Sequence, residues 1–241
     1  RRLFEPITDK AKFSGRDAVV TGFNRMYAEN KADFPAGCGE ETYRRKMEAA
    51  YPLHPFLFDM LYGEWSTLDK FQRTRGVLRL LAKVIHRLWE SQDAGLFILP
   101  ASLPMDDPGV RSELTRYLDD VWEPIMSEDV DGPNSLPLEI DRQNPNLGRT
   151  SACRRVARTL YLGTAPGSAG RNPGIDDRGV KLGCTQPGEH SATFGDALRR
   201  ISDRAKHIHQ DGNRYWVSTK ANLNRLADDR ANALITQTEE L

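Results

Sequence analysis

The chain has 241 residues, a hydrophobic content of 39% and equal numbers of basic and acidic side chains, 34 of each. This composition is typical of a globular protein with one large or two small domains, and the equal numbers of basic and acidic residues exclude a large net charge. No stretch approaches the ~18 apolar residues of a membrane span, and no secretion signal opens the chain, so we expect no membrane contact and a cytoplasmic location. Because the sequence starts with Arg1-Arg2 and not Met, we expect it to be part of a longer protein.

The first ninety residues are predicted to form four helices, because apolar residues recur there at spacings of three and four. The first two helices are expected over residues 17–30 and 40–50. The third begins at Pro55 and ends at Gly63, and the fourth spans residues 71–90. Its predicted buried stripe consists of Leu78, Leu81, Ile85 and Leu88. Four helices joined by short links are typical of a compact bundle.

The fourth helix carries a basic residue at every fourth position, which places these residues in a ridge along one side. The ridge consists of Arg75, Arg79, Lys83 and Arg87. Glycine inside a helix costs about 1 kcal/mol relative to alanine, so Gly76 indicates a close backbone approach or a helix start. Because a guanidinium is always charged and can bind phosphate through two nitrogens, we interpret Arg75 and Arg79 as candidate phosphate contacts. Lys83 and Arg87 are interpreted as solvated surface.

The middle of the chain has three recognisable parts. Residues 96–99 are apolar and indicate a short buried strand, although a helical turn fits the same residues. Asp107 and Pro108 are typical of an N-cap and a first helical residue, and the apolar face of that helix is expected to run on to Trp122. Residues 127–148 are rich in Pro, Asn and Asp, which predicts an irregular connection and a domain boundary.

The charge is distributed unevenly around this boundary. Residues 101–150 carry 4 basic and 11 acidic side chains, whereas residues 151–230 carry 14 basic and 8 acidic ones. Such a reversal indicates two modules with different surfaces, or two solvated faces.

The last ninety residues predict a helix over 150–162, a short helix near 175–182 and an amphipathic helix over 193–205. The alternation across 207–217 around an Asp-Gly pair then predicts a β-hairpin. Helix, short helix, helix and hairpin is the order of a winged helix, and a further helix is expected over 222–235.

The predicted fold class is therefore mainly α, a helical lid-type bundle followed by a winged-helix-like domain with a small β-hairpin. The predicted domains are a helical lid-like bundle over 1–95, an acidic helix and irregular connection over 96–148, and the winged-helix-like domain over 149–241.

The helix over 193–205 and the hairpin after it are candidates for nucleic-acid binding, because helix-turn-helix domains read the major groove with such a helix. The candidate residues are Arg199, Arg200, Arg204, Arg214 and Lys220. Packing against other protein parts is the competing interpretation, because Asp196 and Asp203 lie three or four residues from the first two arginines and can neutralise them.

No catalytic or metal-binding residues are predicted. His207 and His209 point the same way on the predicted strand, but no third ligand is evident. His54 is interpreted as a helix-start or packing residue and not as a general base, because no nucleophile or carboxylate can be placed beside it. The three cysteines are far apart and lack the spacing of a zinc site or a disulfide framework.

Five segments resemble a family of large prokaryotic AAA+-like ATPases that carry domain of unknown function 499, with similar proteins among phage-defence systems. The segments are residues 51–82, 106–120, 129–149, 194–205 and 211–219. The likeness runs from about Arg1 to Arg230. No Gly-x-x-x-x-Gly-Lys-Ser/Thr motif is present, so the resemblance covers the lid and winged-helix-like portion without the phosphate cradle.

The resemblance implies roles for particular residues and partners. Gly76 and Arg79 match the Gly-x-x-Arg of sensor two, whose arginine reaches the γ-phosphate of the bound nucleotide. Arg73 and Arg75 are secondary candidates, as a further phosphate contact or a finger into a neighbouring subunit. ATP and magnesium are expected in the longer protein and none on this part alone.

The expected partners are the amino-terminal ATPase domain of the same protein, further copies of the chain, and DNA. The expected function is nucleotide sensing within a defence ATPase, without catalysis by this part itself. The alternative is a nucleic-acid-binding winged helix that is independent of ATP.

Overall fold

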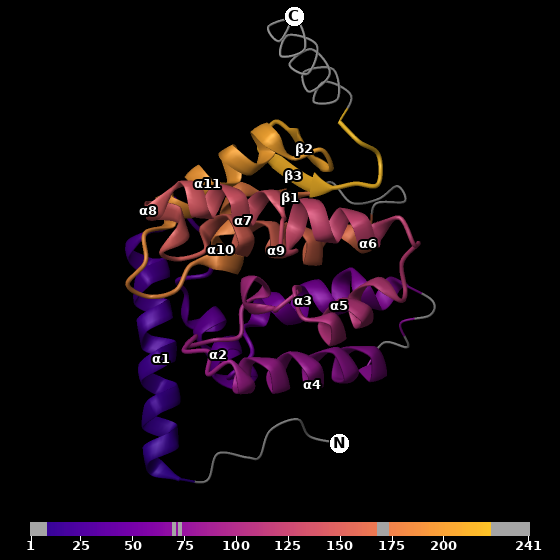
Figure 1. Ribbon diagram of the computed structural model, residues 1–241. Helices are drawn as coiled ribbons and strands as arrows, with labels where there is room; N and C mark the ends of the chain where they lie inside the picture. The colour runs from indigo at the N-terminus through magenta and orange to yellow at the C-terminus, as the bar shows by residue number, and fades with distance from the viewer. Residues whose placement is uncertain (1–8, 69–70, 72–73, 168–173, 223–241) are drawn as a thin grey trace, which may run out of the picture.

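The computed structural model describes residues 9–68, 71, 74–167 and 174–222 (Figure 1). The chain is mainly helical and has one small sheet near its C-terminal end, as the sequence predicted. The longer α-helices are α1 (Lys10–Glu29), α2 (Glu41–Ala50), α3 (Pro55–Gly63), α4 (Thr74–Glu90), α5 (Pro108–Thr115), α7 (Leu136–Gln143), α9 (Ala152–Thr164), α10 (Asp177–Cys184) and α11 (Ser191–Arg204). None of the helices in these ranges is both long and apolar enough to cross a membrane.

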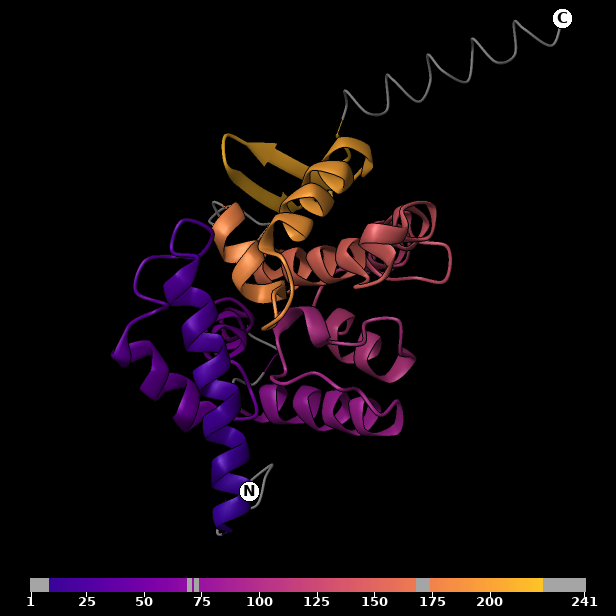
Figure 2. The same cartoon turned by 90° about the vertical axis from the view of Figure 1, so that its left-hand side faces the viewer.

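The helices form two layers, with α3, α4 and α5 in one and α6, α7, α9 and α10 in the other (Figure 1). Helix α1 stands along the side of both layers, as the rotated view shows (Figure 2). It packs through Val20, Phe23 and Tyr27 in an apolar cluster that also includes Met47 of α2 and Leu182 of α10. This cluster therefore connects the N-terminal helices to the second layer.

Helix α3 begins at Pro55 because the preceding residue, His54, caps it. The Nδ1 atom of His54 accepts a hydrogen bond from the Phe56 amide at 3.3 Å, and its Nε2 lies 3.1 Å from the Tyr27 hydroxyl. Complete burial lowers the pKa of His54 to about 3. The prediction of a helix-start and packing role is confirmed.

Helix α4 is present, but its predicted buried stripe is only partly correct: Leu81 is in the core, and Ile85 and Leu88 pack against the core from its edge. The residues that face the core are Val77, Leu80, Leu81 and Val84, whereas Leu78, Ile85 and Leu88 are only half-buried. Of the predicted set, Leu81 alone is fully buried. The stripe is rotated because the helix packs with its Val77 side against neighbours that are distant in sequence.

Three predictions for the middle of the chain are corrected. Residues 96–99 form no strand of the sheet; Ile98 makes an isolated parallel bridge to Leu53, and Leu96 is exposed. The helix that Asp107 caps ends at Thr115, and α6 (Trp122–Ile125) is a separate turn. The expected irregular connection over 127–148 is largely helical, because most of it belongs to α7, α8 (Pro145–Gly148) and a single π-helical segment, Met126–Val130.

Helix α9 is central to the second layer and is buried on nearly all sides, which explains its high content of small and apolar residues. Its buried residues include Val156, Ala157, Leu160 and Tyr161. Cys153 and Cys184 are also buried, and neither they nor Cys38 form a disulfide.

The C-terminal part has the winged-helix-like arrangement that the sequence predicted. Strand β1 (Ile175–Asp176) lies between α9 and α10, and the hairpin of β2 (Ile208–Asp211) and β3 (Arg214–Val217) follows α11. The sheet is antiparallel with the order β1-β3-β2, and Gly212 at the turn has a positive φ of 56°. The helix expected over 222–235 lies outside the described residues, apart from Asn222.

One large apolar cluster extends from Leu53 in the first layer to Val217 in β3. Its members come from all three segments into which the sequence was divided, at residues 95 and 148. The division into three domains stays a prediction.

Candidate functional site

The first turn of α4 explains why residue 76 is a glycine. Gly76 is buried, and a Cβ atom there would collide with the carbonyl oxygen of Phe71 and lie 3.0 Å from its ring. The close backbone approach that the sequence indicated is therefore made by Phe71. Arg75 is exposed and has no ion-pair partner within the described ranges, and Arg73 lies outside those ranges.

Three cations next to this turn converge on one buried carboxylate. Oε1 of Glu113 on α5 lies 3.1 Å from Nη2 of Arg79, 2.9 Å from Nζ of Lys83 and 3.1 Å from Nη1 of Arg116. The Glu113 side chain is 1% exposed, while the three cations are 42–47% exposed. The carboxylate thus forms the floor of a cluster whose positive groups reach the surface. We call these four residues the Glu113 cluster.

The Glu113 cluster carries excess positive charge. Among the described residues, Glu113 is the only acid at ion-pair distance from Arg79, Lys83 or Arg116. Burial raises the pKa of Glu113, but Lys83, Arg79 and Arg116 together oppose this effect and hold the pKa below its ordinary value. Glu113 is therefore ionised at neutral pH, and the cluster has two more positive than negative charges.

Sequence reasoning found only part of this cluster. The sequence indicates Arg79 as a phosphate contact and Lys83 as solvated surface, and it gives no signal for Glu113 or Arg116. The helix period gives the i, i+4 relation between Arg79 and Lys83. It does not reveal that α5, more than thirty residues later, packs beside α4 and inserts a carboxylate between them.

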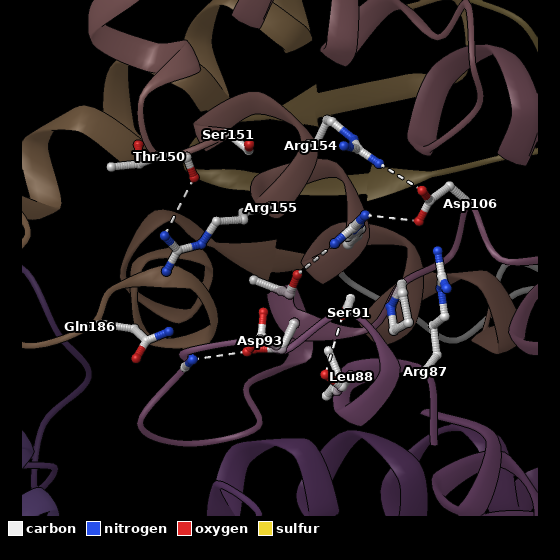
Figure 3. Close-up of a pocket in the computed structure, with 15 residues that line it drawn as sticks. Arg87, Leu88, Ser91, Asp93, Asp106, Thr150, Ser151, Arg154, Arg155 and Gln186 are labelled. Atoms are coloured by element: carbon white, nitrogen blue, oxygen red, sulfur yellow. Dashed lines mark hydrogen bonds and ion pairs between the residues drawn. The ribbon is translucent and has the colours of Figure 1, made fainter. Parts of the chain in front are cut away.

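A second group of arginines lines a polar cavity of about 350 Å³ between the two layers (Figure 3). Arg154 and Arg158 of α9 each lie 2.7 Å from the carboxylate of Asp131, which is fully buried. Each also lies 3.3 Å from the carboxylate of Asp106, which is partly exposed. Asp106 lies just before α5, so these ion pairs connect α9 to the first layer.

The remaining arginines of the cavity are also matched by acids. Arg155 contacts Glu189 at 2.6 Å and donates to the carbonyl oxygen of Cys184. Arg87, the last residue of the α4 ridge, lies 3.7 Å from Asp107. The N-terminus of α9 is occupied as well, because the amides of Cys153 and Arg154 donate to the carboxylate of Asp141. The arginines of the cavity are thus matched by acids, and Arg154 and Arg158 also join α9 to the segment that precedes α5.

The predicted nucleic-acid contacts on α11 are present on the surface, but their charge is largely matched. Arg199 and Arg200 both pair with Asp196, and Arg200 also donates to Asn144 at 3.2 Å. Arg204 pairs with Glu139 of α7 at 2.8 Å, which lowers the pKa of that glutamate. The arginines therefore also link α11 to the neighbouring helices.

The hairpin residues have their own intramolecular contacts. Arg214 donates to the Gly174 carbonyl at 2.7 Å, and the Lys220 amide donates to the Ser218 hydroxyl at 3.2 Å. The imidazoles of His207 and His209 each lie at hydrogen-bond distance from a backbone carbonyl. No group of three or more His, Cys, Asp and Glu side chains suited to a metal ion occurs in the described part of the chain.

These features define a mainly helical protein with a winged-helix-like C-terminal part and a cationic cluster between α4 and α5. The family described as DUF499 second domain matches residues 1–176, so the chain belongs to this family. The match includes the whole Glu113 cluster and ends before α11. No curated protein and no solved structure matches the chain.

Proposed function

We propose that the chain is the nucleotide-sensing lid and winged-helix portion of an AAA+-like ATPase that acts in prokaryotic defence against phage. The observation that carries the proposal is the Glu113 cluster, in which Arg79 lies among three half-exposed cations that share one acid. Unmatched guanidinium and ammonium groups favour phosphate oxygens as ligands.

The residues present fit only the phosphoryl part of a nucleotide. The sequence lacks a Walker lysine motif, so the base, the ribose and the magnesium ion are expected on the amino-terminal ATPase domain of the longer protein. When bound, the magnesium-nucleotide supplies the phosphoryl group. Within this chain, Arg79 orients towards that group and stabilises its negative charge.

The contacts beyond the cluster offer a physical connection from Arg79 to the winged helix. Glu113 is part of α5, and Asp106, just before α5, pairs with Arg154 and Arg158 of α9. A displacement of α5 on nucleotide binding would therefore alter the contacts of α9, the first helix of the winged-helix-like part.

The alternative function, nucleic-acid binding independent of ATP, has less support from the geometry. Arg199, Arg200 and Arg204 meet two carboxylates and an amide, whereas the Glu113 cluster has one acid for three cations. Neutralised cations release few counterions on binding DNA and so contribute little affinity.

The proposal is tested by Arg79→Ala in the longer protein that contains this chain. We expect ATP hydrolysis, measured as steady-state phosphate release, to fall by about tenfold or more because a phosphate contact is lost. Arg79→Lys keeps the positive charge but loses the planar guanidinium, so its rate of ATP hydrolysis should lie between those of the wild type and Arg79→Ala. Arg44→Ala on α2 is the control. An unchanged rate for Arg79→Ala would refute the sensor role.

A further inference from the structure

We infer that Lys83 and Arg116 act with Arg79 as a three-cation binding site for the terminal phosphoryl groups of a nucleotide. This inference rests on the proposed function for the identity of the ligand. It assigns ligand contacts to Lys83, in the middle of α4, and to Arg116, which directly follows α5.

The first argument is geometric. One nitrogen from each of the three side chains lies within 3.1 Å of the same atom, Oε1 of Glu113. No two of these nitrogens can be farther apart than twice that distance. Several oxygens of one phosphoryl group, or of two adjacent groups, can therefore contact all three side chains together.

The second argument is the charge of α4. Like charges at positions i and i+4 destabilise a helix, yet Arg75, Arg79, Lys83 and Arg87 place three such pairs in succession. Glu113 offsets one unit of this charge, and Glu90 and Asp107 each lie 3.7 Å from Arg87. The repulsion that is left is therefore the one among Arg75, Arg79 and Lys83. Helix stability does not explain the arrangement, whereas an anionic ligand would lower the repulsion.

The third argument concerns unused donors. A guanidinium has five N–H groups, and in the described structure Arg79 and Arg116 each donate to Glu113 through one nitrogen. Most of their donors are therefore available to a ligand at the surface. In the cavity between the layers, by contrast, Arg158 donates to Asp131, Asp106 and the Ala101 carbonyl.

The test is calorimetric titration of the chain with inorganic tripolyphosphate, with uncharged adenosine as the comparison ligand. We expect saturable binding of tripolyphosphate that weakens with salt, and none of adenosine. Lys83→Gln and Arg116→Gln should each weaken binding by about tenfold, because each removes a charge-assisted contact. Lys83→Arg keeps the charge and should stay within about twofold of the wild type.

Arg44→Gln is the matched control, because Arg44 is also a partly exposed surface arginine but pairs with two acids, Glu41 and Glu48. It should leave tripolyphosphate binding unchanged. Absence of saturable binding by the wild type would overturn the inference, and so would equal losses in Arg44→Gln, Lys83→Gln and Arg116→Gln.

The same variants in the longer protein separate this inference from the proposed function. If Arg79→Ala slows ATP hydrolysis but Lys83→Gln and Arg116→Gln do not, the sensor function holds and the three-cation site is refuted. If tripolyphosphate binding depends on Lys83 and Arg116 while Arg79→Ala leaves hydrolysis unchanged, the anion site holds and the sensor function is refuted.

Discussion

Two basic surfaces in the described part of the chain can be compared, the Glu113 cluster between α4 and α5 and the arginine face of α11, and each has three cations. In the cluster, one buried acid lies beneath cations that reach solvent. On α11, Arg199 and Arg200 share Asp196 and Arg204 has Glu139, and these acids are themselves partly exposed. Each surface has three basic residues, but one acid lies among those of the Glu113 cluster and two lie among those of α11.

This difference shows that a group of basic residues indicates an anion-binding site only when the acidic residues that contact it are known. On α11 the partners lie within four residues or on the adjacent α7, and the two acids, Asp196 and Glu139, offset two of the three positive charges. At the Glu113 cluster the single carboxylate of Glu113 offsets only one of the three positive charges. Anion binding is therefore expected at the cluster first.

The largest expected effect comes from Gly76→Ala. This variant tests whether the first turn of α4 requires a glycine for its close contact with Phe71. Alanine is the better helix former by about 1 kcal/mol, but its Cβ would collide with the Phe71 carbonyl. We expect a loss of about 3 kcal/mol in the free energy of unfolding, measured with denaturant.

Gly15→Ala in α1 is the control for this variant, because nothing lies within 4 Å of a Cβ added there. It should raise the free energy of unfolding by about 0.5 kcal/mol. If Gly76→Ala were also stabilising, packing against Phe71 would not require the glycine. That result would favour the other explanation, in which residue 76 is a glycine because a phosphate approaches the backbone there.

A smaller effect is expected from Glu113→Gln, which compares the acids of the two surfaces directly. Removing a buried charge that three cations share should cost about 2 kcal/mol in the free energy of unfolding at neutral pH. Glu139→Gln on the α11 side removes a half-exposed acid and should cost less than about 0.5 kcal/mol. Equal losses would mean that the Glu113 cluster is an ordinary surface ion pair.

The pH dependence of this difference has a definite sign. The pKa of Glu113 lies below its ordinary value in the folded chain. Its contribution to stability is therefore complete above the unfolded pKa of about 4.3 and is lost as the pH falls through the folded value. The gap between wild type and Glu113→Gln should close in that acidic range, as denaturant titrations at several pH values can measure.

The smallest effect is expected from the double variant Arg199→Gln with Arg200→Gln. Because Asp196 and Asn144 already occupy these arginines, affinity for duplex DNA should change by less than about twofold. Fluorescence anisotropy at two salt concentrations measures this. Arg44→Gln with Arg45→Gln removes the same charge as a control. A selective loss in the α11 variant, with a steep salt dependence, would favour the nucleic-acid-binding alternative.

The sequence by itself determined much of the local structure of this protein, although not that of residues 96–99 or 127–148. Apolar spacing predicted α2, α3, α4, α9 and α11, Asp107 and Pro108 predicted the start of α5, and the Asp-Gly pair predicted the hairpin. These features depend on residues within one or two turns of each other, and short-range rules describe such interactions well.

The tertiary structure decided which of those residues form a site. It rotated the buried stripe of α4 towards Val77, made residues 136–148 helical through packing against α9, and placed Glu113 and Arg116 beside Arg79 and Lys83. Each outcome depends on contacts between segments far apart in the chain. Helical periodicity shows which side chains share a face, but only packing determines what charge lies opposite them.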